Sequence, residues 1–117
     1  MYKLTILIEV QEDREAFERG WPEFLAAAEA MPGLLRESTS RVDRVLHGTQ
    51  HVEMIHDLYF TSLKEAAAAM GSPEGERAGQ VLQRITGGRV TLLLADHTED
   101  SLPNIRKFAG DPPGDRA

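Results

Sequence analysis

Three polar side chains that lie close together in the chain, His56, Asp57 and Tyr59, are of the types that bind or protonate small molecules. A histidine titrates near neutral pH, which suits it to act as a general acid or base. A carboxylate and a phenol two residues apart can bind or protonate a small polar ligand. We therefore predict His56 and Asp57 as candidate catalytic residues and Tyr59 as a candidate ligand-binding residue.

The segment that carries these residues, 52–60, has the alternation that is typical of a β-strand. His56 falls on the apolar face with Met54, which should turn toward the helices, whereas Asp57 and Tyr59 fall on the other face. Both predictions have a structural alternative. A lone histidine on an apolar face is most often a hydrogen-bonded core residue, and polar strand residues often pair with the neighbouring strand. The candidate cross-strand partners of Glu53, Asp57 and Tyr59 are Arg36, Arg41 and Arg44.

Aromatic side chains recur at helical spacing in the first third of the chain, where Phe17, Trp21 and Phe24 share one stripe of a helix. Pro22 interrupts this pattern, so we expect either a kinked helix or a second helix that begins at the proline. A kink would separate the helix from its sheet and leave a pocket. Trp21, Phe24 and Met54 are the predicted ligand-binding residues of this pocket, and ordinary core packing is the alternative.

Stop signals beside apolar runs divide the chain into a strand, a helix, two strands, a helical region and a last strand. This β-α-β-β-α-β order predicts an α+β, ferredoxin-like fold, with a four-stranded antiparallel sheet and helices on one face. The expected strands are 3–10, 34–46, 52–60 and 90–95, with a short turn at 47–50 between the middle two.

Two helix starts are marked in the second half of the chain. Ser62 and Glu65 form a capping box, and Ser72 with Pro73 is typical of an N-cap followed by a first-turn proline. The inner stripes expected for these two helices are Leu63, Ala66, Ala67 and Met70, then Ala78, Val81, Leu82 and Ile85.

We expect one domain over residues 1–97 and a flexible tail over residues 98–117. The tail is rich in Asp, Pro and Gly and has little apolar area to offset the entropy of ordering. Docking of Ile105 and Phe108 on the body or on a partner subunit is the alternative.

The composition limits the partners. Thirteen basic and nineteen acidic residues give a net charge of -6, which disfavours nucleic acid and anionic membranes. The absence of cysteine excludes disulfides and thiolate metal sites. His51, Glu53 and His47 lie at or near a hairpin tip and lack a convincing third fixed ligand, so no metal or other cofactor is expected. Neither a signal peptide nor a membrane span is expected, which predicts a cytoplasmic protein.

The predicted sheet favours a homodimer. Helices cover one face of such a sheet, and the other face would carry Leu7, alternate residues of 92–95, and Ile55 or Tyr59. Because such a patch is too apolar to remain in water, we expect a second copy to pack against it sheet to sheet with two-fold symmetry. Coverage of this face by the tail is the alternative.

Several short motifs follow one another in a distinctive order between Tyr2 and Asp96. They are Lys3-Leu4-Thr5, Met31-Pro32-Gly33-Leu34, Asp57-Leu58-Tyr59-Phe60, Ser62-Leu63, Ser72-Pro73-Glu74-Gly75, and Gly87-Gly88 before Val90-Thr91-Leu92-Leu93. Together they resemble the EthD family of dimeric α+β barrel proteins. The resemblance implies an association with bacterial degradation gene clusters, including one for ethyl tert-butyl ether, although most members have no known reaction.

Relatives that share the barrel include small monooxygenases, isomerases, decarboxylating lyases and proteins with no established chemistry. Many EthD members carry a histidine on the first helix, and the corresponding position of this chain is Phe24, so the role of that histidine does not carry over. The sequence thus predicts a homodimer that acts on or binds a small hydrophobic organic molecule in a catabolic pathway. If it is an enzyme, it is expected to be cofactor-independent; a non-catalytic binding or accessory homodimer is the alternative.

Overall fold

Four strands and three helices follow one another in a computed structural model that describes residues 1–103. They occur in the predicted β-α-β-β-α-β order, with two successive helices in the second helical position. The elements are β1 (Tyr2–Glu9), α1 (Arg14–Glu29), β2 (Arg36–Arg41), β3 (Val52–Phe60), α2 (Leu63–Met70), α3 (Pro73–Thr86) and β4 (Val90–Asp96).

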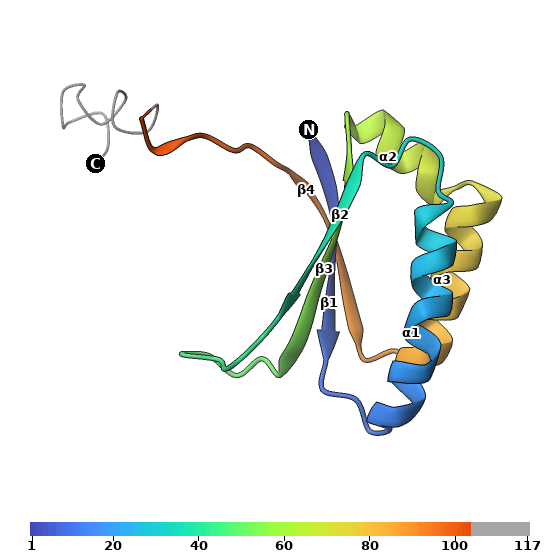
Figure 1. Ribbon diagram of the computed structural model, residues 1–117, viewed down its shortest axis with the longest axis vertical. Helices are drawn as coiled ribbons and strands as arrows, with labels where there is room; N and C mark the ends of the chain where they lie inside the picture. The colour runs from blue at the N-terminus through green and yellow to red at the C-terminus, as the bar shows by residue number, and fades with distance from the viewer. Residues whose placement is uncertain (104–117) are drawn as a thin grey trace.

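The strands form one antiparallel sheet in the order β2-β3-β1-β4, which confirms the predicted ferredoxin-like fold. The three helices lie on one face of this sheet, and no helix of the described chain lies on the other face (Figure 1). We call the second face the open face. The described chain beyond β4 leaves on the side of the open face (Figure 1).

The core lies between the sheet and the helices, as the alternation of the strands predicts. β1 contributes Leu4, Ile6 and Ile8 to it, and all three are buried. β3 contributes Met54, His56, Leu58 and Phe60. α1 contributes Phe17, Trp21, Phe24, Ala27 and Ala28. The assignment of His56 to the helix side and of Asp57 to the open face is therefore confirmed by the register of the sheet.

The predicted helix boundaries are set by local hydrogen bonds. Ser62 Oγ accepts a hydrogen bond from the Glu65 amide, and Ser72 Oγ accepts one from the Gly75 amide. Gly87 ends α3 in the left-handed region, with a φ of 59°, where a side chain would be strained. Pro22 lies inside one uninterrupted α1, so the alternative of two separate helices is wrong.

The second strand is shorter than predicted, because β2 ends at Arg41 rather than at Leu46. Residues 42–51 form the connection to β3, and within it the Leu46 side chain is 89% exposed. Val45 and Leu46 therefore give no apolar face that would extend the strand. The first strand was predicted to end at Val10, but this residue lies beyond β1 and is exposed.

The inner stripes of the second and third helices differ in part from the prediction. In α2 the buried residues are Ala66 and Ala69, whereas Ala67 and Leu63 are exposed. In α3 Thr86 is buried and Ile85 only partly so, and the Thr86 hydroxyl is satisfied by donating a hydrogen bond to the Leu82 carbonyl. The predicted alternative docking of Ile105 and Phe108 falls on residues 104–117, which lie outside the described residues.

Candidate functional site

A cleft of about 390 Å³ opens between α1 and the β3 side of the sheet. Its apolar surface comes from Phe17 and Trp21 of α1 and from Met54 of β3. Positively and negatively charged side chains from different elements border this apolar floor. The full lining consists of Ile8, Arg14, Phe17, Glu18, Trp21, Pro22, Arg41, Glu53 and Met54.

Trp21 lies in the middle of an aromatic row on α1. Its ring is 5.4 Å from that of Phe17 and stacks on Phe24 at 5.0 Å between centroids. Such contacts add to the energy of burial and hold the ring in one orientation. Phe24 is part of the core and does not line the cleft. It borders a second, mostly apolar cavity of about 280 Å³ that opens toward β4, beside Leu92 and Gly79.

The predicted ligand-binding residues are thus divided among three places. Trp21 and Met54 line the cleft, Phe24 borders the second cavity, and Tyr59 lies on the open face. The volume of the cleft suits a small organic ligand. Ligand binding by these four residues stays a prediction.

His56 lies directly beneath the aromatic row and is completely buried. The rings of His56 and Trp21 pack edge to face, with 5.3 Å between their centroids and an angle of 87° between their planes. His56 Nδ1 is hydrogen bonded to Thr39 Oγ1 at 2.8 Å. His56 Nε2 lies 3.3 Å from Glu37 Oε2, and neither of these buried atoms has a hydrogen-bond partner among residues 1–103.

The surroundings of His56 and Glu37 shift both pKa values. Burial lowers the pKa of His56, while the charges of Asp57 and Glu29 act in the opposite direction. The pKa of Glu37 is raised to about 7, mainly by burial and in addition by a hydrogen bond with the neighbouring Glu29 and by its charge. A neutral imidazole and a carboxyl that titrates near neutrality are therefore adjacent, which is an arrangement able to move a proton.

Glu37 and Thr39 were not among the predicted site residues. They face the helices because β2 pairs with β3 in a register that sets Thr39 opposite His56 and Glu37 opposite Leu58. The alternation of β2 would have identified both residues if the register had been known. A connection of ten residues, 42–51, separates the strands and leaves that register undetermined in the sequence.

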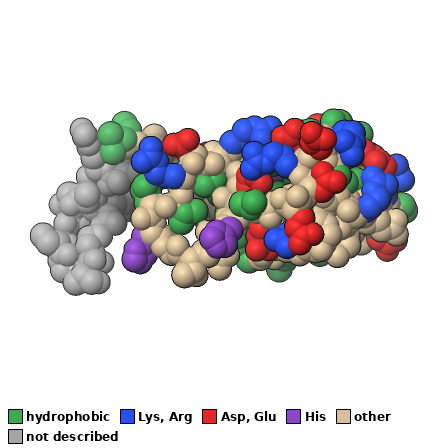
Figure 2. All heavy atoms as spheres, turned by 90° about the horizontal axis from the view of Figure 1, so that it is seen from below, with side chains coloured by type: hydrophobic (Ala, Val, Ile, Leu, Met, Phe, Trp, Pro, Cys, Tyr) green, Lys and Arg blue, Asp and Glu red, His purple; other side chains and the backbone are tan. Residues whose placement is uncertain are grey.

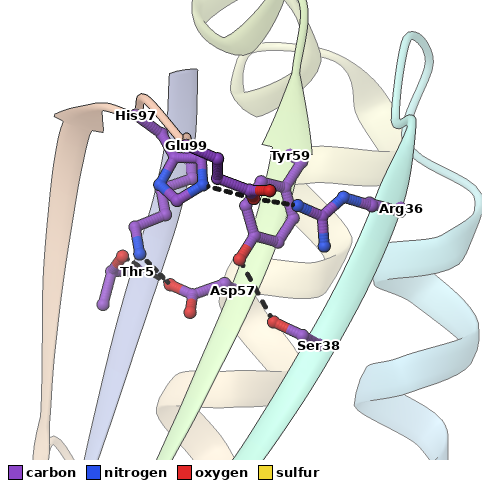
Figure 3. Close-up of polar contacts among 8 residues, drawn as sticks. Thr5, Arg36, Ser38, Asp57, Tyr59, His97 and Glu99 are labelled. Carbon is purple, nitrogen blue, oxygen red and sulfur yellow. Dashed lines mark hydrogen bonds and ion pairs between the residues drawn. The ribbon is translucent and has the colours of Figure 1, made fainter. Parts of the chain in front are cut away.

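The other predicted catalytic residue, Asp57, lies on the open face within a polar cluster (Figure 3). Thr5 Oγ1 donates a hydrogen bond of 2.5 Å to Asp57 Oδ1, and Lys3 Nζ lies 3.7 Å from the same oxygen. These contacts occupy the carboxylate. Because His56 and Asp57 project from opposite faces of the sheet, the structure does not bring the two predicted catalytic residues together.

Tyr59 completes this cluster with residues of β2 and of the chain after β4 (Figure 3). The Arg36 guanidinium lies 3.8 Å from the centre of the Tyr59 ring, and the phenol oxygen is 3.3 Å from Ser38 Oγ. His97 contacts the same ring edge to face, and Glu99 bridges His97 and Arg36. The chain after β4 therefore covers one end of the open face.

The alternative that these polar residues pair with arginines of the neighbouring strand holds for Tyr59 only. Asp57 is paired with Lys3 and Thr5 of β1, and Glu53 forms an ion pair with Arg14 of α1. Glu53 leaves the open face because the pairing of β1 with β3 shifts by one residue there, so that no residue of β1 lies opposite Glu53.

Several predicted absences concern the described residues only. Between residues 1 and 103 no three His, Asp or Glu side chains are grouped closely enough to hold a metal ion. No helix in the same part of the chain has the length and hydropathy to cross a membrane. Figure 2 shows acidic and basic side chains intermingled over the helical part of one face, without a basic patch there.

The chain was compared with known proteins. No family model matches it. It is 29% identical over 104 residues, which are 88% of this chain and 100% of the relative, to an "uncharacterized 11.0 kDa protein in thcB-thcC intergenic region" of Rhodococcus erythropolis.

Solved structures confirm the fold and the predicted resemblance. An EthD family protein from Bacillus halodurans C-125 has a TM-score of 0.77 and 23% identity, covering 84% of this chain and 99% of that one. A dimeric ferredoxin-like protein of unknown function from Jannaschia sp. CCS1 has a TM-score of 0.63 and 16% identity, covering 83% and 100%. SnoaB, a cofactor-independent oxygenase from Streptomyces nogalater, has a TM-score of 0.62 and 14% identity, covering 87% and 96%.

Proposed function

We propose that this chain is an EthD-like homodimer that binds a small, largely apolar organic molecule in the cleft between α1 and β3. The single observation that carries the proposal is the cleft itself, because its floor of Phe17, Trp21 and Met54 is apolar and its volume is about 390 Å³. Ligand sites of small molecules combine such a floor with a few polar groups at the edge, and Arg14 and Arg41 border this one. A catabolic role and a cytoplasmic location are part of the proposal.

The homodimer follows from the open face. Its end away from the polar cluster carries Leu7 and Ile55, and Leu93, which is 47% exposed, lies opposite Thr5 at the border of that cluster. A second copy that packs there would remove this apolar surface from water. The Jannaschia protein, which has the same fold, is described as dimeric.

A second candidate function is cofactor-independent proton transfer to or from the bound molecule. Its support is the adjacency of His56 and Glu37 beneath the cleft, where Trp21 separates the imidazole from the ligand space. A shift of the Trp21 ring would be needed to give a ligand access to His56. Asp57 projects from the opposite face of the sheet, so any part that it plays in this second candidate function would be limited to the interior of the proposed dimer.

The chain contains its own reporter for the binding proposal, because Trp21 is its single tryptophan and lines the cleft. We expect nitrobenzene, a small apolar quencher, to reduce the Trp21 fluorescence in a saturable way. Met54→Phe, which narrows the cleft, should weaken this binding at least about tenfold, about 1.4 kcal/mol. Met70→Phe, at the second cavity, is the matched control and should leave it unchanged.

Native mass spectrometry of the protein purified from its own source tests the natural ligand. A retained small molecule on a dimer, lost in Met54→Phe and kept in Met70→Phe, would support the proposal. Linear, non-saturable quenching together with a dimer that carries no ligand would exclude a binding cleft.

The catalytic candidate is tested with the identified ligand. His56→Gln keeps a hydrogen-bonding side chain but removes the titrating group, so turnover should fall by a factor of about 100 or more, as for loss of a general acid or base. Turnover unchanged by His56→Gln would leave only the binding function.

A further inference from the structure

His56 has no direct contact with water, because its side chain is completely buried. A buried imidazole that gains or loses a proton needs a neighbouring group that can carry that proton to solvent. One of its two ring nitrogens, Nδ1, is already engaged by the Thr39 hydroxyl. The path for the proton must therefore be sought at Nε2.

Glu37 is the group that faces Nε2, and its Oε2 lies 3.3 Å away. This oxygen is buried and has no hydrogen-bond partner in the described part of the chain, although 27% of the Glu37 side chain is exposed. Two unpartnered polar atoms that face each other in an apolar core are costly unless they exchange a proton or a hydrogen bond. Glu37 thus connects the buried ring to the surface of the sheet edge.

Glu29 extends this connection to water. It is the exposed last residue of α1, and its carboxyl helps to raise the pKa of Glu37 through a hydrogen bond and charge repulsion. Two carboxyl groups form such a bond only when one of them holds a proton. The charged groups that act on His56 are therefore Glu29 from α1, Glu37 from β2 and Asp57 on the far face of β3.

We propose that Glu37 is a positioning residue that exchanges the Nε2 proton of His56 with solvent, with Glu29 as the surface group. The imidazolium gives its Nε2 proton to the Glu37 carboxylate, and the resulting carboxyl gives a proton to Glu29 and then to water. No other bond forms or breaks. The inference rests on the proposed function only in supplying a use for the path, namely the return of His56 to its neutral form after it has accepted a proton from the ligand.

Ring nitrogen NMR of the full chain tests this path without any ligand. We expect the His56 Nε2 signal, identified by its absence in His56→Gln, to show an inflection near pH 7, where Glu37 ionises. Glu37→Gln should abolish the inflection and Glu37→Asp should restore one. Glu29→Gln should move it to lower pH, whereas Glu15→Gln, an exposed change on the same helix, should leave it in place.

An inflection that persists in Glu37→Gln, or that Glu29→Gln does not move, would overturn the proposed path. If Glu37→Gln does not fold, Glu29→Gln still decides the question, because its side chain is exposed. The result is independent of the binding proposal. A missing ligand with a normal inflection would refute the binding function alone, and a bound ligand without the inflection would refute the path alone.

Discussion

Glu37 shows how a single partly buried carboxyl links the site to stability. The folded protein keeps a proton on Glu37 up to about pH 7, because burial and Glu29 raise its pKa from 4.5. In the unfolded chain the same group loses its proton near 4.5. Between these two pH values the folded state holds more protons, so the free energy of unfolding decreases as the pH rises through this window.

We therefore predict that the wild type loses on the order of 2 kcal/mol of stability relative to Glu37→Gln between about pH 5 and about pH 8. Glutamine keeps the shape and hydrogen-bonding capacity but cannot ionise. His56, whose pKa is lowered, contributes the opposite slope below its unfolded pKa of 6.5. Urea unfolding at a series of pH values measures the difference; parallel curves for the two proteins would contradict it.

The residue types of the site could be predicted from sequence better than their groupings. Alternation along residues 52–60 correctly set His56 toward the helices and Asp57 away from them. The same alternation could not reveal that Thr5 and Lys3 occupy Asp57, or that Glu37 faces His56. Those contacts depend on strand register and on a bulge near Glu53, which no local pattern encodes.

At the scale of elements, the approach of α2 and α3 depends on one glycine. A Cβ at Gly75 would lie 2.1 Å from the Ala69 carbonyl oxygen and 2.7 Å from that of Met70, both of which are backbone atoms of α2. The absence of a side chain lets the first turn of α3 lie against the end of α2. Gly79, one turn later, has no atom within 4 Å of an added Cβ.

This difference predicts opposite effects for the same substitution on the same helix. Gly75→Ala should destabilise the protein by ~3 kcal/mol, because the clash can be relieved only by moving a helix. Gly79→Ala should stabilise it by about 0.5–1 kcal/mol, since alanine favours the helix. Thermal or urea unfolding measures both changes. Equal effects of the two variants would show that the helices are not packed this closely.

Most elements could be predicted because their ends are marked by residue types with a defined backbone role. Ser62, Ser72 and Gly87 lie at the helix ends that their types predict. The end of β2 could not be predicted, since Val45 and Leu46 continue a strand-like composition although they have no neighbouring layer to pack against. Burial, rather than propensity, decides where such an edge strand ends.

At the scale of the whole molecule, the open face has two unlike ends. One end is polar and is covered by His97 and Glu99, which contact Tyr59 and Arg36 (Figure 3). The other end carries Leu7 and Ile55, and Leu93 lies between the two ends, opposite Thr5; none of the three has such a cover among the described residues. The expected dimer contact is therefore concentrated on these apolar side chains.

We predict that Leu93→Glu converts the dimer to a monomer at micromolar concentration, because it would bury a charge in an apolar contact. Leu63→Glu is the matched control: the two leucines are 47% and 48% exposed, but Leu63 lies on α2 in the helical layer. Sedimentation velocity over a dilution series distinguishes the species. A wild type that is monomeric throughout, or a dimer that survives Leu93→Glu, would refute sheet-to-sheet pairing.

The position of β4 at the edge of the sheet makes the chain prone to aggregation. Its consecutive leucines, 92–94, project to both sides of a strand whose outer hydrogen-bonding groups have no neighbouring strand in the sheet. An edge of this kind is a template on which another extended chain can grow. Assembly with a second copy on the open face would then compete with fibre-like polymerisation for Leu93, so that chains would be most vulnerable before such an assembly forms.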